Sequence, residues 1–195
     1  MINAIVLAAG RSKRMGKPKP LLRFGNTTFL EQIISVLKLS DVDRVTVVLG
    51  AEAQAIEKSI DLSGTDVVVN KDYRKGQLSS LIAGLKNTPN QTDAILVCLV
   101  DNPFITKIVV NRVISKFKET NSPIVVPVFN KKRGHPTLFS RSLFKELRNA
   151  PLKEGARGVI HSNEEKVLEL KMRESKILVS IDTPEDYKLH LGAGP

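Results

Sequence analysis

Short runs of β-branched and other apolar residues alternate with longer helical patterns along the first two thirds of the chain. The predicted strands lie at 4–7, 44–49, 66–69, 94–99 and 123–127, and the predicted helices lie between them at 28–39, 52–60, 78–86 and 106–117. This alternation is typical of βαβ units around a mainly parallel sheet. The chain is therefore expected to have an α/β fold.

The pattern is less regular after residue 127. We expect a turn at 134–136, helices at 140–147 and 156–162, and a strand at 166–170. A further helix is expected after Thr183, because Thr is a good N-cap, Pro184 suits the first helical position, and acidic residues follow in the first turn. The 195 residues contain no internal repeat or linker, so one domain spanning 1–195 is the simplest organisation.

A cationic loop follows the first predicted strand. Between Ala8 and Phe24 there are six Lys or Arg residues and no Asp or Glu, after a turn of small residues at 8–10. The carboxyl end of a strand is where an open α/β sheet binds its ligand, and small residues let backbone N–H groups approach phosphate oxygens. The loop therefore predicts a cradle for a triphosphate, with a solvated surface as the alternative. It matches neither the Walker loop nor the three-glycine dinucleotide fingerprint.

The net charge of +10 suits nucleic acid, a membrane surface or a small polyanion. Only 5% of the residues are aromatic and Trp is absent, which argues against a protein that stacks single-stranded nucleic acid. No signal-type leader and no apolar run of membrane-spanning length occurs, so we expect a cytoplasmic protein without a nucleic-acid or membrane partner.

Cys98 lies within an apolar run and is expected to be a core residue rather than a reactive thiol.

Asp101 comes just after the predicted strand 94–99, so it should lie at the same sheet edge as the cationic loop. Mg²⁺ is commonly held by one or two carboxylates together with substrate phosphates. Asp101 is therefore the first candidate for a Mg²⁺ ligand. The alternative is an ordinary turn that caps the next helix, because Asp and Asn before Pro often do this.

The segment from Leu7 to Lys19, with its two glycines, Arg14 and Met15 in register, resembles the signature of nucleotidyltransferases with a glycosyltransferase-A type fold. Later segments resemble the branch that contains molybdenum cofactor cytidylyltransferase and the molybdopterin-guanine dinucleotide synthesis protein A: residue 70 with 76–85, then 101–103, 133–136, 155–157 and 182–186. This resemblance implies a Rossmann-like three-layer α/β/α fold with a mainly parallel sheet. It also implies a nucleotide-binding half at about 1–103 and an acceptor-binding half at about 104–195.

By this resemblance the reaction is Mg²⁺-dependent transfer of CMP or GMP from CTP or GTP to molybdopterin, with release of pyrophosphate. The implied catalytic residues are Arg14, Lys19 and Asp101, and the implied metal ligands are Asp101 and Asp182. The implied nucleotide-binding residues are Leu7, Ala8, Ala9, Gly10, Arg11, Lys19, Asn70, Gly76, Ser79 and Ser80, and the implied acceptor-binding residues are His135, Pro136 and Arg157. Arg11, Lys13 and Lys17 could equally be electrostatic background.

Simpler structural roles stand beside these assignments. Asn70 and 76–80 could form only a strand-end turn and a helix N-terminus, His135 could be a packed turn residue, and Asp182 could cap the last helix. The chain also departs from the family motifs. Leu152 and Lys153 replace a Gly and an Asp, Ser180 replaces an Asp, and Asn102 replaces a Gln.

The turn at Ala8 to Gly10 resembles the cytidylyl enzymes, whereas the guanylyl branch carries Ala-Gly-Gly, so CTP is the preferred donor. The departures at 152, 153 and 180 bear on the acceptor more than on the triphosphate, which leaves methylerythritol phosphate or a sugar phosphate as alternative acceptors. A nucleotide-binding accessory protein for the maturation of a molybdoenzyme partner is a different class of function. A nucleic-acid-binding module fits the net charge but not the order of the motifs.

Overall fold

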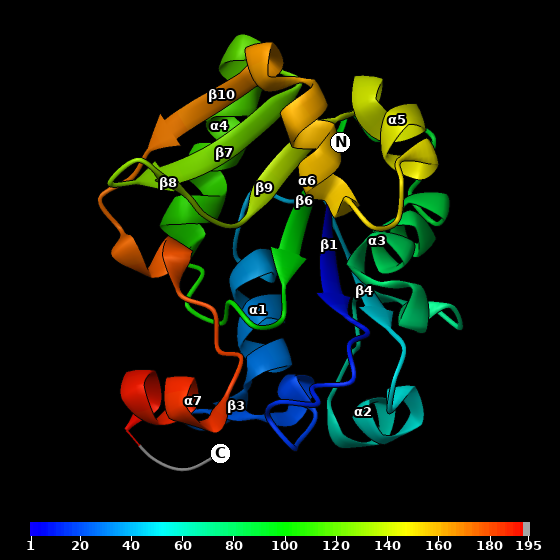
Figure 1. The fold of residues 1–195 in the computed structure, drawn as a ribbon, viewed down its shortest axis with the longest axis vertical. Coiled ribbons are helices and arrows are strands. Elements are labelled where there is room, and N and C mark those ends of the chain that lie inside the picture. The colour runs from blue at the N-terminus through cyan, green and yellow to red at the C-terminus, as the bar shows by residue number, and fades with distance from the viewer. Residues whose placement is uncertain (193–195) are drawn as a thin grey trace.

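The computed structural model describes residues 1–192. Its main sheet has the strand order β10-β7-β9-β6-β1-β4-β5, with the short β8 paired to β7 (Figure 1). The strands are β1 (Ile2–Ala8), β4 (Arg44–Leu49), β5 (Asp66–Val69), β6 (Ala94–Leu99), β7 (Ile124–Phe129), β8 (Lys132–Arg133), β9 (Thr137–Ser140) and β10 (Val167–Lys171). Neighbouring strands of the main path are parallel except for β9, which is antiparallel to both β6 and β7.

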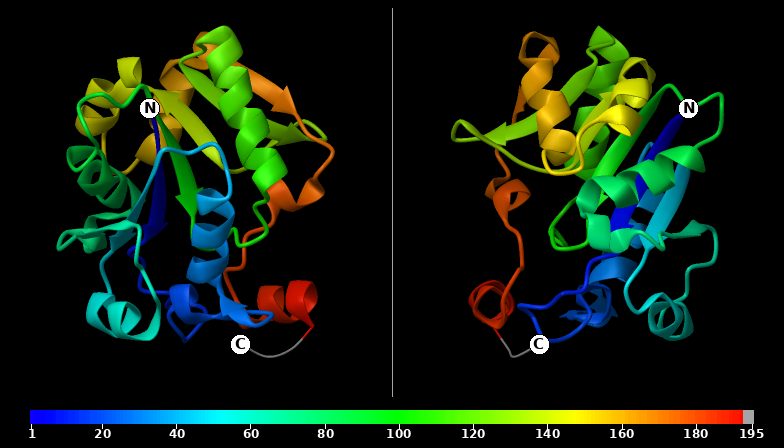
Figure 2. Two further views of the ribbon diagram at one scale, coloured as in Figure 1. Left: turned by 180° about the vertical axis from the view of Figure 1, so that it is seen from behind. Right: turned by 45° about the vertical axis from the view of Figure 1, so that its right-hand side comes forward.

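Helices cover both faces of this sheet. They are α1 (Phe29–Lys38), α2 (Ala53–Ser59), α3 (Gln77–Lys86), α4 (Lys107–Thr120), α5 (Phe144–Asn149), α6 (Gly155–Ser162) and α7 (Pro184–Leu191). Figure 1 shows α3, α5 and α6 over one face, and the reverse view in Figure 2 shows α1 and α4 over the other. The expected three-layer α/β/α fold with a mainly parallel sheet is confirmed.

The side chains of β1 explain why both faces need helices. Successive side chains of a strand point to opposite faces of a sheet. Ala4 and Val6 pack with α1 and α4 in one apolar core, and Ile5 and Leu7 pack with α3 in the other. All seven residues of β1 are buried, as expected for a central parallel strand, and six of them are apolar.

Three predicted strands, 44–49, 66–69 and 94–99, have the boundaries of β4, β5 and β6, and the strands predicted at 4–7, 123–127 and 166–170 correspond to β1, β7 and β10. The elements predicted after residue 127 differ in part from those of the structure. The helix predicted at 140–147 is wrong in its first half, because Thr137–Ser140 forms β9 and a 3-10 turn, Arg141–Leu143, precedes α5. All four residues of β9 are buried, and their sequence, Thr-Leu-Phe-Ser, does not alternate between polar and apolar residues. The sequence therefore does not mark this run as a strand.

The order of the strands places a crevice beside β1. The chain passes from β1 to β4 and β5 on one side, and then returns to β6 on the other side of β1. In open α/β sheets, ligands bind at the carboxyl ends of the strands where the order reverses in this way. The carboxyl ends of β1, β4 and β6 point to one edge, toward α2 and α7 (Figure 1).

The C-terminal segment returns to this edge after β10. It passes through a 3-10 helix, Ser175–Leu178, and ends in α7. Thr183 is the N-cap of α7, as predicted, and its hydroxyl accepts a hydrogen bond from the N–H of Asp186. Tyr187 anchors α7, because its hydroxyl donates to the carbonyl of Arg23 at 2.7 Å in the small hairpin of β2 (Arg23–Phe24) and β3 (Thr27–Thr28).

Cys98 is the last residue but one of β6 and is fully buried. Burial raises the pKa of its thiol to about 12, so the prediction of a core residue is confirmed. No helix within residues 1–192 combines the length and the apolar character needed to cross a membrane.

Candidate functional site

The loop after β1 folds back on itself so that one lysine is held in place. Ser12 has a positive φ of 49°, and its carbonyl accepts hydrogen bonds from the N–H groups of Met15 and Gly16. Its hydroxyl accepts a hydrogen bond from the N–H of Lys19 at 2.9 Å. Met15 is buried in the core and anchors the loop. Ser12, which the sequence analysis did not single out, therefore fixes the start of the 3-10 turn Lys19–Leu21.

A pocket of about 320 Å³ opens at the crevice beside β1. This volume is at the lower end of the range of about 300–1,000 Å³ typical of small-molecule sites. The structure brings nine of the predicted site residues into its lining: Leu7, Ala9, Gly10, Arg14, Lys19, Gly76, Ser80, Asp101 and Asp182. The other lining residues are Ser12, Lys13, Tyr73, Gln77 and Val100.

Two lysines of the loop face this pocket in different ways. Lys19 is only 9% exposed and is paired with carboxylates, whereas Lys13 is exposed and makes no ion pair within residues 1–192. Lys13, for which background charge was one of the alternatives, lines the pocket. Arg11 is exposed and lies outside the lining, and Ala8 is buried in the core.

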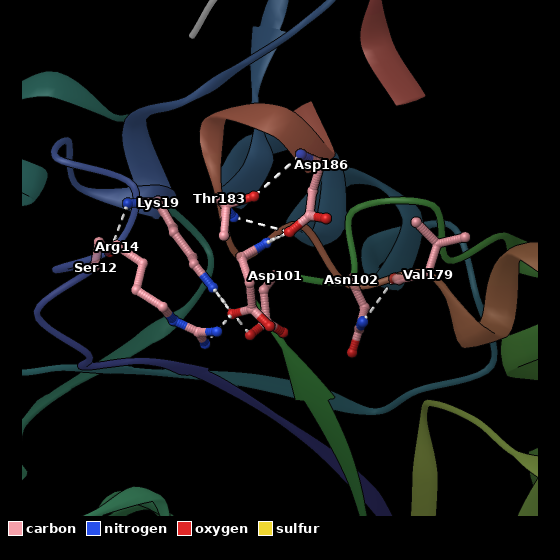
Figure 3. Close-up of polar contacts among 9 residues, drawn as sticks. Ser12, Arg14, Lys19, Asp101, Asn102, Val179, Thr183 and Asp186 are labelled. Carbon is pink, nitrogen blue, oxygen red and sulfur yellow. Dashed lines mark hydrogen bonds and ion pairs between the residues drawn. The ribbon is translucent and has the colours of Figure 1, made fainter. Parts of the chain in front are cut away.

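Two carboxylates meet at the ammonium of Lys19 (Figure 3). Its Nζ donates to Oδ1 of Asp182 at 2.6 Å and to Oδ2 of Asp101 at 3.3 Å. The guanidinium of Arg14 lies 3.1 Å from the same Oδ1 of Asp182. The hydrogen bond from Lys19, aided by the charges of Lys19 and Arg14, holds the pKa of Asp182 below its usual value despite partial burial. Asp182 is therefore ionised at neutral pH.

The structure separates both acids from the helix-capping roles that were the alternatives. Thr106 caps α4 in place of Asp101, because its hydroxyl accepts from the N–H of Val109. Thr183 and Asp186 form the capping box of α7, so the carboxylate of Asp182 is left to face Lys19. The run 177–181 that precedes Asp182 is not a strand of the sheet, since it begins within a 3-10 helix.

Asp101 and Asp182 are the residues of this pocket that could hold a divalent metal. The Oδ1 atom of Asp101 is buried and has no hydrogen-bond partner within residues 1–192, so it retains a free acceptor. Both acids already share one cation, the Lys19 ammonium, so their carboxylates lie on the same side of the pocket around one positive charge. The described part of the chain has no group of three or more His, Cys, Asp or Glu arranged for a metal. A two-carboxylate site completed by substrate phosphates and water fits Mg²⁺ or Mn²⁺ better than Zn²⁺.

The wall of the pocket opposite these acids comes from the start of α3. Asn70 is buried, and its side-chain amide donates to the hydroxyls of Ser79 and Ser80, each at 3.0 Å. Its Oδ1 accepts from the N–H of Asp72 at 2.9 Å. Gly76 and Ser80 line the pocket, whereas Asn70 and Ser79 lie outside the lining. Asn70 stabilises this wall through its hydrogen bonds to Ser79 and Ser80.

The predicted acceptor residues lie outside the pocket lining. The backbone N–H of His135 donates to the carbonyl of Ile177 at 3.0 Å, and Pro136 is buried behind it. Arg157 is exposed near the start of α6. Burial lowers the pKa of His135, opposed by the charge of Asp101 and aided by that of Arg157. The Nδ1 atom of His135 is buried with no hydrogen-bond partner in the described structure.

Replacing His135 with Gln is expected to reduce the loss of stability on acidification. The ordinary pKa of His is about 6.5. Because the native pKa is lower, the unfolded chain gains a proton as the pH falls below about 6.5, before the native protein does, and stability drops. Thermal melting at pH 7.5 and 5.5 measures the effect, with exposed His161→Gln as the control. An equal fall in Tm for the wild type and the His135 variant would contradict it.

Comparison with known proteins identifies the family. The MobA-like NTP transferase domain matches residues 4–167. Over 155 residues, 73% of this chain and 72% of the relative, the sequence is 32% identical to nicotine blue oxidoreductase of Paenarthrobacter nicotinovorans. Over 187 residues, 95% of this chain and 93% of the relative, it is 27% identical to molybdenum cofactor cytidylyltransferase of Escherichia coli (strain K12).

Solved structures agree with this assignment. The crystal structure of Rv0371c from Mycobacterium tuberculosis H37Rv superposes with a TM-score of 0.89 at 33% identity, covering 98% of this chain and 97% of that one. A complex of Rv0371C with manganese superposes with a TM-score of 0.85 at 31% identity, covering 98% of both chains. The chain is a nucleotidyltransferase and belongs to the MobA-like NTP transferase domain family.

Proposed function

We propose that this pocket transfers CMP, with GMP as the alternative, from a nucleoside triphosphate to the phosphate of molybdopterin in a Mg²⁺-dependent reaction. The observation that carries the proposal is the meeting of Lys19 and Arg14 with Asp101 and Asp182 at the carboxyl ends of β1 and β6. Cations that neutralise phosphate and acids that hold a metal are what nucleotidyl transfer requires.

The reaction needs positioning and charge neutralisation more than covalent help. An oxygen of the acceptor phosphate attacks the α-phosphorus in line, the bond to the oxygen that bridges the α- and β-phosphates breaks, and pyrophosphate leaves. Backbone N–H groups at Ala9 and Gly10, together with Lys13 and Arg14, would hold the β- and γ-phosphates. Lys19 would neutralise charge that develops on the α-phosphate. Mg²⁺ held by Asp101 and Asp182 would supply Lewis-acid polarisation of the phosphates.

The metal assignment draws on two independent supports. The free Oδ1 of Asp101 and the proximity of both acids to one ammonium fit a small divalent ion. The similar mycobacterial protein has been crystallised with manganese, which prefers the same oxygen ligands.

The acceptor assignment draws on the relatives that cover nearly the whole chain. They are named molybdenum cofactor cytidylyltransferase and probable molybdenum cofactor guanylyltransferase.

We further propose that the chain works as one domain, with a nucleotide half near 1–103 and an acceptor half near 104–195, because the β6-β9-β7 pairing joins the two halves in one sheet. His135, Pro136 and Arg157 would then lie on the acceptor side, with a molybdoenzyme as the recipient of the product.

Ala9→Gly is expected to shift base selectivity from CTP toward GTP. Ala9 is 4% exposed and lines the pocket, and its methyl group lies beside Gly50 and Tyr73. Removing one methyl from a binding wall changes discrimination modestly, so we expect a change of about threefold to tenfold in the ratio of kcat/KM values. Competition between CTP and GTP in one reaction measures this ratio. A wild type that uses GTP faster than CTP would contradict the argument from the turn.

A thermal-shift screen tests the proposed donor. A ligand that binds only the native state raises its stability by an amount that grows with the logarithm of its concentration over Kd. With Mg²⁺ present, CTP is expected to raise Tm more than GTP, ATP or UTP. This rise should shrink in the Asp101→Ala variant. Equal Tm with and without all four nucleotides would overturn the assignment of the pocket.

A further inference from the structure

Asn102 follows Asp101 directly, and its side chain reaches the C-terminal segment that carries Asp182. The Nδ2 of Asn102 donates a hydrogen bond to the carbonyl of Val179 at 2.7 Å (Figure 3). Because a carbonyl only accepts, this contact fixes which end of the amide faces Val179. Asn102 is 5% exposed, so little water is available to replace the bond.

Three alternate residues of the 177–182 segment, Ile177, Val179 and Ile181, form hydrogen bonds to residues that follow β8 or β6. The carbonyl of Ile177 accepts from the N–H of His135 at 3.0 Å, and the N–H of Ile181 donates to the carbonyl of Asp101 at 2.8 Å. Val179 lies between these two points, and Asn102 is its partner. The bond from Asn102 is the one of the three that is made by a side chain.

These contacts hold the segment that precedes Asp182 next to Asp101. Asp101 is held by the end of β6, whereas Asp182 lies in a segment that belongs to no strand. On its other side, Asp182 is fixed by α7, because its N–H donates to the carboxylate of Asp186 at 2.9 Å. Without the Val179 contact, the part of the segment between Ile177 and Ile181 loses its middle attachment, three residues before Asp182.

We infer that Asn102 is a positioning residue that holds the carboxylate of Asp182 at the distance from Asp101 required to bind one divalent cation. This inference rests on the proposed metal site and deepens it. Asn102 itself lies outside the pocket lining. It acts through the backbone of Val179, and thereby joins the nucleotide-binding part of the sheet to the C-terminal segment.

The test compares Mn²⁺ affinity among variants of the full chain. Asn102→Leu keeps a side chain of similar size but cannot donate to Val179. It is expected to raise the Kd for Mn²⁺ about tenfold, equivalent to about 1.4 kcal/mol. Asn102→Gln retains a donor amide, so its Kd should stay within about threefold of the wild type. The free Mn²⁺ signal in electron paramagnetic resonance gives Kd without added nucleotide.

Asn163→Leu is the matched control. Asn163 is also buried, and its Nδ2 donates to a backbone carbonyl, that of Val159, at 2.9 Å. This variant should lower Tm while leaving the Kd for Mn²⁺ unchanged. Asn102→Ala replaces the leucine variant if leucine prevents folding.

Asp182→Ala separates this inference from the proposed function. If it weakens Mn²⁺ binding while folded Asn102→Leu and Asn102→Ala bind like the wild type, Asn102 has no positioning role. If it leaves Mn²⁺ binding unchanged, the metal site fails and the inference fails with it.

Discussion

Asp101→Ala is expected to abolish nucleotidyl transfer while leaving the fold intact. The Asp101 side chain is 24% exposed, and its contact with Lys19 is 3.3 Å long, so its removal costs little packing. It would, however, remove one of the two carboxylates proposed to hold the metal. We expect the rate to fall below detection and Tm to change by only a few degrees.

Asp93→Ala is the matched control for this experiment. Asp93 directly precedes β6 at the strand's opposite end, and pairs with the N-terminal ammonium at the surface. It should retain wild-type transfer. Wild-type activity in Asp101→Ala, or loss of activity only in proportion to a large fall in Tm, would refute a metal-binding role for Asp101.

Lys19→Ala is expected to reduce kcat by about two to three orders of magnitude. A preorganised donor aimed at charge that develops in the transition state contributes about 3 kcal/mol in comparable sites. Lys19 is fixed for this task by the hydroxyl of Ser12 on its backbone and by two acids at its ammonium. Because the substitution removes a cation from the two carboxylates, it should not weaken Mn²⁺ binding.

Lys13→Ala provides the contrast. Lys13 is unpaired within residues 1–192 and lies on the exposed rim of the pocket, so it should affect KM for the triphosphate more than kcat. Exposed Lys118 on α4 serves as a neutral control. Equal losses of kcat at positions 13 and 19 would show that the loop acts as a diffuse positive field rather than as a defined cradle.

The predictable parts of the fold were those with a strong local pattern. β4, β5 and β6 follow from apolar runs between turns, and the helix that begins after Thr106 follows from its N-cap. β9 could not be predicted, because four buried residues between a turn and a helix carry no periodicity. Its antiparallel place between β6 and β7 is decided by tertiary packing.

The candidate site was predictable where residues follow a strand directly, as Ala9, Gly10 and Asp101 do. The approach of Asp182 to Asp101 depends on an irregular segment. It was expected from the resemblance to the family and from the β-branched run 177–181, which does not form a strand. The contact of Asn102 with Val179 spans 77 positions in the sequence, and no local pattern indicates it. Tyr73 and Gln77 also line the pocket; Gln77 lies within the family segment 76–85, whereas no local pattern indicates Tyr73.

Nucleotidyl transfer in this pocket would replace the pyrophosphate of the nucleoside triphosphate with a phosphorylated acceptor. The most direct test incubates the protein with α-labelled CTP or GTP, Mg²⁺ and molybdopterin, and measures both pyrophosphate and labelled acceptor. We expect equal amounts of the two products, a higher rate with CTP, and neither product with Asp101→Ala. Release of no pyrophosphate from either nucleotide by the folded wild-type protein would contradict it.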